Sequence, residues 1–215
     1  MDITSLGHSS FKLRGKSATV VTDPFAGMTV GMPFPKHTAS DIVTVSHWHD
    51  DHNAISVVEG SPFVISGPGE YEIKGVGIVG IGVYHDDVKG QKRGKNTIYR
   101  IEIDGISFVH LGDLGHELSA SEVDSLDGVD VLFVPTGGVY TIDPAQASKV
   151  VHEIEPTIVI PMHYNRPGMN QKIFAGLVGV DAFLKEMGKT EVAPQPKLSI
   201  TKDKLPEEMQ VVVLQ

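Results

Sequence analysis

The sequence has no cysteine among its 215 residues. This absence excludes disulfide bonds, iron–sulfur clusters, cysteine-ligated zinc and a cysteine nucleophile. Any metal ion that the chain binds must therefore use histidine, aspartate or glutamate side chains. The hydrophobic core must also hold together without covalent cross-links.

Long apolar runs and an excess of positive charge are missing as well. No stretch is long enough to span a bilayer, and Met1–Ser5 lacks the basic and apolar segments of a secretory signal. We therefore expect a cytoplasmic protein with no membrane partner. Eighteen basic residues against 27 acidic ones give a net charge of −9, which disfavours nucleic acid as a partner. A bound divalent metal can reverse the local charge, so this argument does not exclude nucleic acid.

The remaining composition, with 40% hydrophobic and 21% charged residues, is that of a globular chain, and we expect one domain over residues 1–215. Short runs rich in Val and Ile, interrupted by 23 glycines and 13 prolines, indicate many strands rather than long helices. A hairpin is expected at the start, where Ile3–Leu13 and Ser17–Thr22 flank a turn at Arg14–Lys16. The other expected strands are Ile42–Ser46, Phe63–Ser66, Val76–Tyr84, Thr97–Ile103, Ser107–Leu111, Val129–Val134, Thr157–Ile160, Lys197–Thr201 and Gln210–Leu214.

Three helices are indicated by their end signals. Ser119 and Glu122 form a capping box, and Asp143 followed by Pro144 is typical of a helix start. The second helix is expected to run to about Glu155, before Pro156, and a third to cover Val180–Met187. Helices mixed with hairpins predict an α/β (α+β) fold.

The most informative segment is His47–His52, which reads H-x-H-x-D-H directly after an expected strand. In extended backbone, the side chains of His47 and His49 point to the same side of the chain and can bind one ion. Asp51 and His52 follow a turn and point elsewhere, so two ions fit better than one. The competing interpretation is a polar loop with surface histidines, although such clustering of titratable groups is costly.

A two-metal site needs more ligands than this segment supplies. Three further candidates each follow an expected strand, namely His85, Asp113 and His163. Taken singly, each would more often be structural or solvated. Their common position at strand ends, where loops carry chemistry, predicts that they join the same site.

Several segments resemble the metallo-β-lactamase-fold superfamily, in particular its compact metal-dependent hydrolase branch related to ascorbate-6-phosphate lactonase-like proteins. The resemblance spans positions 6 to 164, and its most specific part is His47–His52. The matching segments are Leu6–Phe11, Thr22–Phe25, His47–His52, Tyr84-His85, Leu111–Asp113 and Pro161–Tyr164.

The resemblance implies an αββα sandwich of mixed sheets flanked by helices, with a dinuclear site at one edge. One ion would be held by His47, His49 and His85, and the other by Asp51, His52 and His163, with Asp113 as the bridge. All-histidine and aspartate ligation favours zinc, with manganese or iron as alternatives.

Some activities of the superfamily are disfavoured by the residues present. The best-known β-lactam hydrolases have a cysteine ligand, which this chain lacks. Flavodiiron reductases have glutamate where His49 stands, and the RNA-processing nucleases carry an inserted domain or a long basic arm for which this chain has no room.

We therefore expect a metal-dependent hydrolase in which a bridging water attacks an ester, lactone or phosphoester bond of a small substrate. Asp51 would orient that water, while His8 and Tyr164 would act on the substrate. The alternatives are a nuclease or phosphodiesterase of the same fold and a metal-binding module without catalysis. The sequence leaves the substrate and the oligomeric state open.

Some residues have two interpretations. Asp23 could accept an N–H from a ligand histidine or form an Asp-Pro turn, and Tyr140 and His116 could face the pocket or pack elsewhere. Glu70 could be tied to the ligands, although Gly67–Glu72 is more typical of a turn entering a strand. The basic loop Asp86–Asn96 could be solvated or could attract anionic substrates at the mouth of the site.

Overall fold

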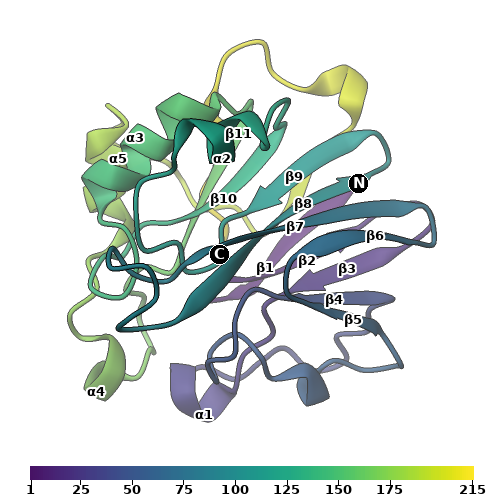
Figure 1. Cartoon of the computed structure of the whole chain (residues 1–215), viewed down its shortest axis with the longest axis horizontal. Helices are drawn as coiled ribbons and strands as arrows, with labels where there is room; N and C mark the ends of the chain where they lie inside the picture. Colours follow the sequence, from purple (N-terminus) through teal and green to yellow (C-terminus); the bar gives the residue numbers. More distant parts are fainter.

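Two β-sheets packed face to face form the centre of the computed structural model, which describes residues 1–215 (Figure 1). The first sheet has six strands, in the spatial order β12 (Leu198–Ser199), β1 (Asp2–Gly7), β2 (Ser10–Arg14), β3 (Thr19–Thr22), β4 (Ile42–Val45) and β5 (Phe63–Ser66). The second has seven, in the order β13 (Gln210–Val211), β11 (Ile158–Met162), β10 (Val131–Pro135), β9 (Ile106–His110), β8 (Lys95–Ile103), β7 (Val76–Tyr84) and β6 (Gly69–Ile73). Both sheets are mixed, as expected.

The predicted first strand, Ile3–Leu13, is wrong in one respect, because two strands occupy this range. The chain reverses at His8, whose φ of 52° lies in the left-handed region, so that β1 and β2 pair antiparallel. The predicted hairpin across Arg14–Lys16 is present between β2 and β3. Gly67–Glu72 enters strand β6, so the turn-into-strand interpretation was right.

The main core lies between the two sheets. Phe11 of β2 and Phe133 of β10 face each other with ring centroids 4.3 Å apart, and both rings are buried. Twenty-two buried residues form this cluster. Since burying a large apolar side chain stabilises by about 1.5–3 kcal/mol, this layer is the main source of stability.

The helices cover the outer faces unequally. The second sheet is covered by α3 (Pro144–Ile154) and α5 (Val180–Glu186), with α2 (Ala120–Asp124) beside them (Figure 1). Asp143 caps α3 by a reciprocal capping box with Gln146, as the sequence predicted. The first sheet has only short cover, from the 3-10 turn Ile55–Val57, and α1 (Gly27–Val30) packs in a separate small cluster with Phe25 and Phe174. The remaining short helices are α4 (Gln171–Phe174) and the 3-10 turn Lys202–Lys204. No helix has the length and apolar character needed to cross a membrane.

Strand direction brings the carboxyl ends of particular strands to one edge of each sheet. Strands β3 and β4 are parallel, and β1 shares their direction because β1 and β3 both run antiparallel to β2. Strands β9 to β11 are parallel, and β7 shares their direction because β7 and β9 both run antiparallel to β8. The loops after these strands therefore start from a common edge in each sheet.

Candidate metal centre

Histidine and aspartate side chains from six of these loops meet where the edges of the two sheets come together. The first sheet supplies His8 after β1, Asp23 after β3, and His47, His49, Asp51 and His52 after β4. The second sheet supplies His85 after β7, Asp113 after β9 and His163 after β11.

One group consists of His47, His49 and His85. One ligand atom from each lies within 4.8 Å of the others. The ring centroids of His47 and His49 are 4.6 Å apart, and those of His47 and His85 are 4.7 Å apart. The structure thus brings together the three residues that the resemblance assigns to one ion.

A second group contains Asp51, His52 and His163, the set that the resemblance assigns to the other ion, together with His8. The side chain of His8 is fully buried, and its Nε2–H donates to Asp51 Oδ2 over 3.2 Å. The contact of His8 in this structure is thus with a candidate ligand, and the action of His8 on the substrate stays a prediction. The left-handed turn after β1 directs its ring onto a carboxylate rather than into open space.

Asp113 lies between the two groups. Its Oδ2 is 3.3 Å from His85 Nε2 and 3.2 Å from His163 Nε2. Its Oδ1 is 3.2 Å from His52 Nε2. One carboxylate thus faces ring nitrogens from both groups, as a bridging ligand would.

Several buried polar atoms at this point have no hydrogen-bond partner. They are Nε2 of His47, His52 and His163, and Oδ1 of Asp113. Leaving a buried polar atom unpaired costs about 1–3 kcal/mol, so such a cluster is unfavourable by itself. Divalent metal ions of the zinc type accept this donor set of imidazole nitrogens and carboxylate oxygens. The residues present fit such ions.

The electrostatics give His47 and Asp113 the protonation states that metal ligation requires. Burial and the neighbouring His52 lower the pKa of His47 to about 3, so its imidazole is neutral at pH 7. Burial also acts on Asp113, but the charges of His163 and His52 outweigh it and hold the pKa of Asp113 well below its usual range. Asp113 is therefore a carboxylate.

A buried aspartate behind the ligands orients them. Asp23 Oδ2 accepts the Nδ1–H of His52 over 2.8 Å and the hydroxyl of Ser46 over 2.6 Å. The Ser46 hydroxyl oxygen is in turn 3.0 Å from Nδ1 of His47. The prediction that Asp23 receives an N–H from one of the site's histidines is confirmed, and the same carboxylate reaches a second histidine through Ser46.

Asp113 is positioned by a residue that the sequence did not single out. Asn96, at the start of β8, accepts the backbone N–H of Asp113 and donates to Leu111 O over 2.8 Å. Between those two residues, Gly112 has a φ of 55°, and a Cβ there would lie 2.3 Å from Asn96 Oδ1. The only sequence signal for Asn96 is its position at the end of the basic loop.

A cavity of about 280 Å³ opens over the two groups. Besides five of the ligand candidates, its walls contain Arg93, Tyr140, Ile173 and Phe174. The Tyr140 hydroxyl is already used, because it donates to Ile173 O over 2.7 Å. The structure thus places Tyr140 in the pocket wall with its hydroxyl engaged.

Other predicted neighbours of the site lie elsewhere. Tyr164 does not line the cavity; its buried ring packs under the guanidinium of Arg166, 5.5 Å away, because the chain turns at His163. His116 accepts the backbone N–H of Tyr84 and does not line the cavity either. Glu70 is an exposed residue of edge strand β6 and is not near the ligands. For His116 and Glu70 the structure thus supports the interpretation in which they lie outside the pocket, and Tyr164 is buried beside His163.

Comparison with known proteins agrees with this geometry. A relative from Thermococcus onnurineus, named a UPF0173 metal-dependent hydrolase, is 30% identical over 186 residues, covering 74% of this chain and 83% of the relative. A solved structure from Thermotoga maritima, described as a candidate Zn-dependent hydrolase of the metallo-β-lactamase superfamily, is 36% identical with a TM-score of 0.80 and covers 99% of this chain and 97% of its own. The isothiocyanate hydrolase from Delia radicum gut bacteria has a TM-score of 0.69 at 15% identity, over 94% of this chain and 100% of its own, and shares the fold alone.

A family model described as the beta-lactamase superfamily domain matches residues 2–163, the part of the chain that carries every histidine and aspartate of the centre. The chain therefore belongs to the metallo-β-lactamase superfamily.

Proposed function

We propose that the protein is a metal-dependent hydrolase with a dinuclear site, which acts on an ester, lactone or phosphoester bond of a small substrate. The observation that supports this most strongly is the single carboxylate of Asp113 facing ring nitrogens of both histidine groups at the floor of a cavity. The names of the Thermococcus and Thermotoga relatives point in the same direction.

In this proposal the ligands divide as the two groups do. One ion would be held by His47, His49 and His85, the other would be held by Asp51, His52 and His163, and Asp113 would serve both. Zinc suits these donors best, and manganese or iron are the alternatives. Bound there, two divalent ions would lower the pKa of a shared water to near neutrality and polarise the bond under attack.

The chain's own part in the reaction falls mainly to Asp51. Its carboxylate lines the cavity and its side chain is 16% exposed, so it can accept a hydrogen bond from the attacking water. His8, which donates to Asp51 from the buried side, fixes the direction of that carboxylate. His8 is thus a positioning residue, and Asp23 has the same role for His52 and, through Ser46, for His47.

The experiment is a turnover assay of metal-loaded protein on a lactone, a carboxyl ester, a thioester, a phosphodiester and a β-lactam, each with and without a chelator. We expect chelator-sensitive turnover of the lactone, the ester or the phosphodiester, reduced at least a hundredfold by Asp51→Asn. Asp87→Asn, an exposed change in a nearby loop, is the matched control and should retain full activity. Turnover that the chelator leaves unchanged, or no turnover in protein loaded with two ions, would contradict the proposal.

A further inference from the structure

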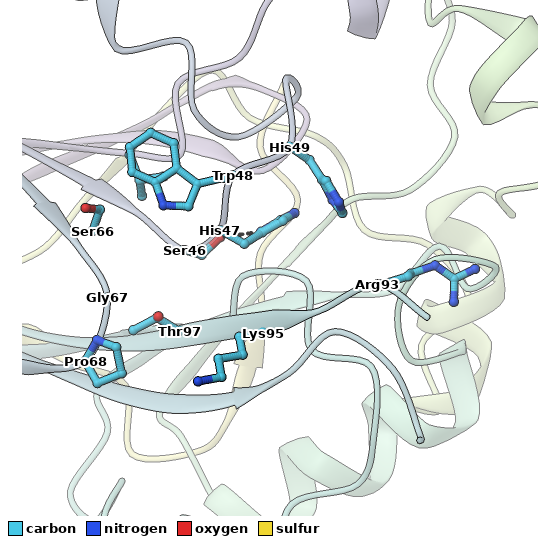
Figure 2. A pocket seen from close by; sticks show the side chains of 11 residues that line it. Ser46, His47, Trp48, His49, Ser66, Gly67, Pro68, Arg93, Lys95 and Thr97 are labelled. Carbon is cyan, nitrogen blue, oxygen red and sulfur yellow. Dashed lines mark hydrogen bonds between the residues drawn. The ribbon is translucent and has the colours of Figure 1, made fainter. Parts of the chain in front are cut away.

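A second cleft of about 380 Å³ adjoins the metal cavity (Figure 2). It lies between the carboxyl ends of β4 and β5 on one side and the start of β8 on the other. Because His49 and Arg93 line both spaces, a molecule could occupy the cleft and reach the metal centre at the same time.

The charge of this cleft is opposite to that of the whole chain. Arg93 and Lys95 line it, and no aspartate or glutamate does, although the chain carries a net charge of −9. Lys95 is exposed and has no carboxylate partner within ion-pair distance. A concave site with cations on its wall raises the local concentration of anions.

Trp48 forms the opposite wall. Successive side chains of extended backbone alternate in direction, so Trp48 points away from the metal centre while His47 and His49 point toward it. Figure 2 shows the indole on the side of the β4 loop and the Lys95 side chain on the side of β8. Trp48 is 65% exposed, which leaves a large apolar face of the indole open to solvent at the wall of the cleft.

Arg93 is held at the junction of the two spaces. Its backbone N–H donates to Asp86 over 2.7 Å, and the carboxylate of Asp86 also accepts three other backbone N–H groups of the loop. The Arg93 guanidinium donates to Val139 O over 3.0 Å and lies 5.6 Å from the Tyr140 ring. The loop therefore presents this cation in a fixed place rather than as a solvated side chain.

We propose that this cleft binds an anionic, planar part of the substrate, with a carboxylate or phosphate group bound by Lys95, a flat ring against Trp48, and Arg93 at the end of the cleft next to the metal cavity. The bond to be hydrolysed then lies over the metal centre. The substrate class is accordingly a small aromatic or heteroaromatic anion. The hydrolysis rests on the proposed function, but binding in the cleft does not.

Trp48 is the single tryptophan of the chain, so its fluorescence reports on this cleft directly. Full-length protein, as purified and after chelation, is titrated with phenyl phosphate, with benzoate and with neutral benzyl alcohol. We expect saturable quenching by both anions, with or without metal, and at least tenfold weaker binding of the alcohol. Equal binding of the anions and the alcohol, or no change in fluorescence, would overturn the proposal. Anion binding only in the metal-loaded protein would also overturn it, because the metal would then be the anion site.

Lys95→Gln is the decisive variant, because the side chain is exposed and its loss should not affect folding. We expect the Kd for phenyl phosphate to rise at least fivefold, and at least twentyfold when Arg93→Gln is added. Lys92→Gln removes the same charge from the same loop but lies outside the cleft, and should change the Kd less than twofold. Equal effects of Lys95→Gln and Lys92→Gln would point to general charge attraction and contradict a specific site.

Turnover separates this inference from the proposed function. If the anions bind but no substrate is hydrolysed, the proposed function is wrong and the proposal of an anion-binding cleft is retained. If turnover is chelator-sensitive and Lys95→Gln leaves the KM of an aryl ester bearing a carboxylate unchanged, the function stands and this inference fails. If both the proposed function and the anion-binding cleft are correct, Lys95→Gln has a higher KM for that ester and an unchanged KM for its neutral counterpart.

Discussion

At the scale of single residues, the centre depends on carboxylates that would not themselves contact a metal ion. Asp23 is fully buried and holds His52 directly and His47 through Ser46. Residues in such positions fix the ring orientation and the tautomer of metal-binding histidines. Their loss commonly lowers metal affinity by roughly 10- to 100-fold.

We therefore expect Asp23→Asn to weaken zinc binding by about 10- to 100-fold. The carboxylate accepts the His52 N–H and the Ser46 hydroxyl at Oδ2 and the Ser46 backbone N–H at Oδ1, whereas an amide has an acceptor at only one of these two positions. Competition with a chromophoric chelator measures this. Asp130→Asn is the control, since Asp130 is also buried and accepts Ser107 N–H and Lys202 far from the site. Equal loss of zinc affinity in both variants would show that the effect is general destabilisation.

Asp86 organises the basic loop through its ionised form. Burial alone would raise the pKa of Asp86, but hydrogen bonds from four backbone N–H groups, the first from Arg93, outweigh it and bring the pKa to about 2. Because the folded-state pKa is below the ordinary value of 3.8, this contribution to stability is complete above about pH 4. It is lost as the pH falls from about 4 to about 2.

Asp86→Asn should therefore unfold with a shallower dependence on pH in this range than the parent protein, since an amide does not titrate. Its KM for anionic substrates should also rise, because Arg93 is no longer held. Denaturant unfolding at pH 2 to 5, with exposed Asp87→Asn as the matched control, measures the first effect. Parallel pH profiles for Asp86→Asn and the parent would contradict this role.

The residues of the candidate centre were largely predictable, for a physical reason. Metal ligands are a few chemically distinct types and must follow strands that end together, so H-x-H-x-D-H, His85, Asp113 and His163 could be recognised one by one. Asn96 and Trp48 could not, because their functions depend on which loop lies opposite them. The directions of the His8 and Tyr164 side chains could not be predicted either, because a left-handed turn at position 8 and a bend at position 163 set where these side chains point.

At the scale of elements, the loops after the strands are as constrained as the ligands that they carry. Gly112 lies between β9 and Asp113, has a φ of 55°, and has no room for a Cβ against Asn96 and Ser46. A side chain here would displace both the backbone of Asp113 and its hydrogen bond to Asn96.

We expect Gly112→Ala to reduce bound metal by at least one ion per chain and to lower stability by more than the ~1 kcal/mol of left-handed backbone strain alone. Gly105→Ala isolates that strain, because Gly105 has a φ of 75° at the other end of β9 and nothing within 4 Å of its added Cβ. Metal content and thermal unfolding of the two variants are the measurements. A Gly112→Ala protein with full metal content and the melting temperature of Gly105→Ala would contradict the account.

Elements with strong local signals were predicted well. Helix α3 has both capping residues and an initial proline, and β5 and β7 are continuous runs bounded by turn residues. Helices α1 and α4 were missed. Each has four residues, too few for an isolated helix, and their packing around Val30 and Phe174 stabilises them instead.

At the scale of the whole molecule, the candidate ligands come from both sheets. His47, His49, Asp51 and His52 follow a strand of the first sheet, whereas His85, Asp113 and His163 follow strands of the second. Metal ions bound to these groups would link the two sheets at one edge of the core. They would also relieve the buried polar atoms that have no partner.

Bound metal should therefore stabilise the entire fold. At free zinc about 1,000-fold above Kd, linkage gives about 4 kcal/mol, which raises the melting temperature by roughly 2–4 °C for each kcal/mol in a chain of this size. Thermal unfolding with and without a chelator measures the shift, and Asp113→Ala should show a smaller one. An identical melting temperature with and without metal would contradict a site that joins the sheets.

The pairing of the sheets was predictable only through the family resemblance. Strand patterns indicate which residues are buried, but the contact between Phe11 and Phe133 joins positions more than a hundred residues apart, and local sequence does not encode such a contact. The negative charge of the chain was a poor guide to its site, because Arg93 and Lys95 make the cleft locally cationic.

The most direct test of the central claim is the number of metal ions bound per chain, determined by elemental analysis of zinc-saturated, desalted protein and of Asp113→Ala. We expect about two ions in the parent protein and one or none in the variant, since the carboxylate of Asp113 faces ring nitrogens of both groups. A folded parent chain that retains no zinc, or a variant that retains as much as the parent, would contradict the dinuclear centre.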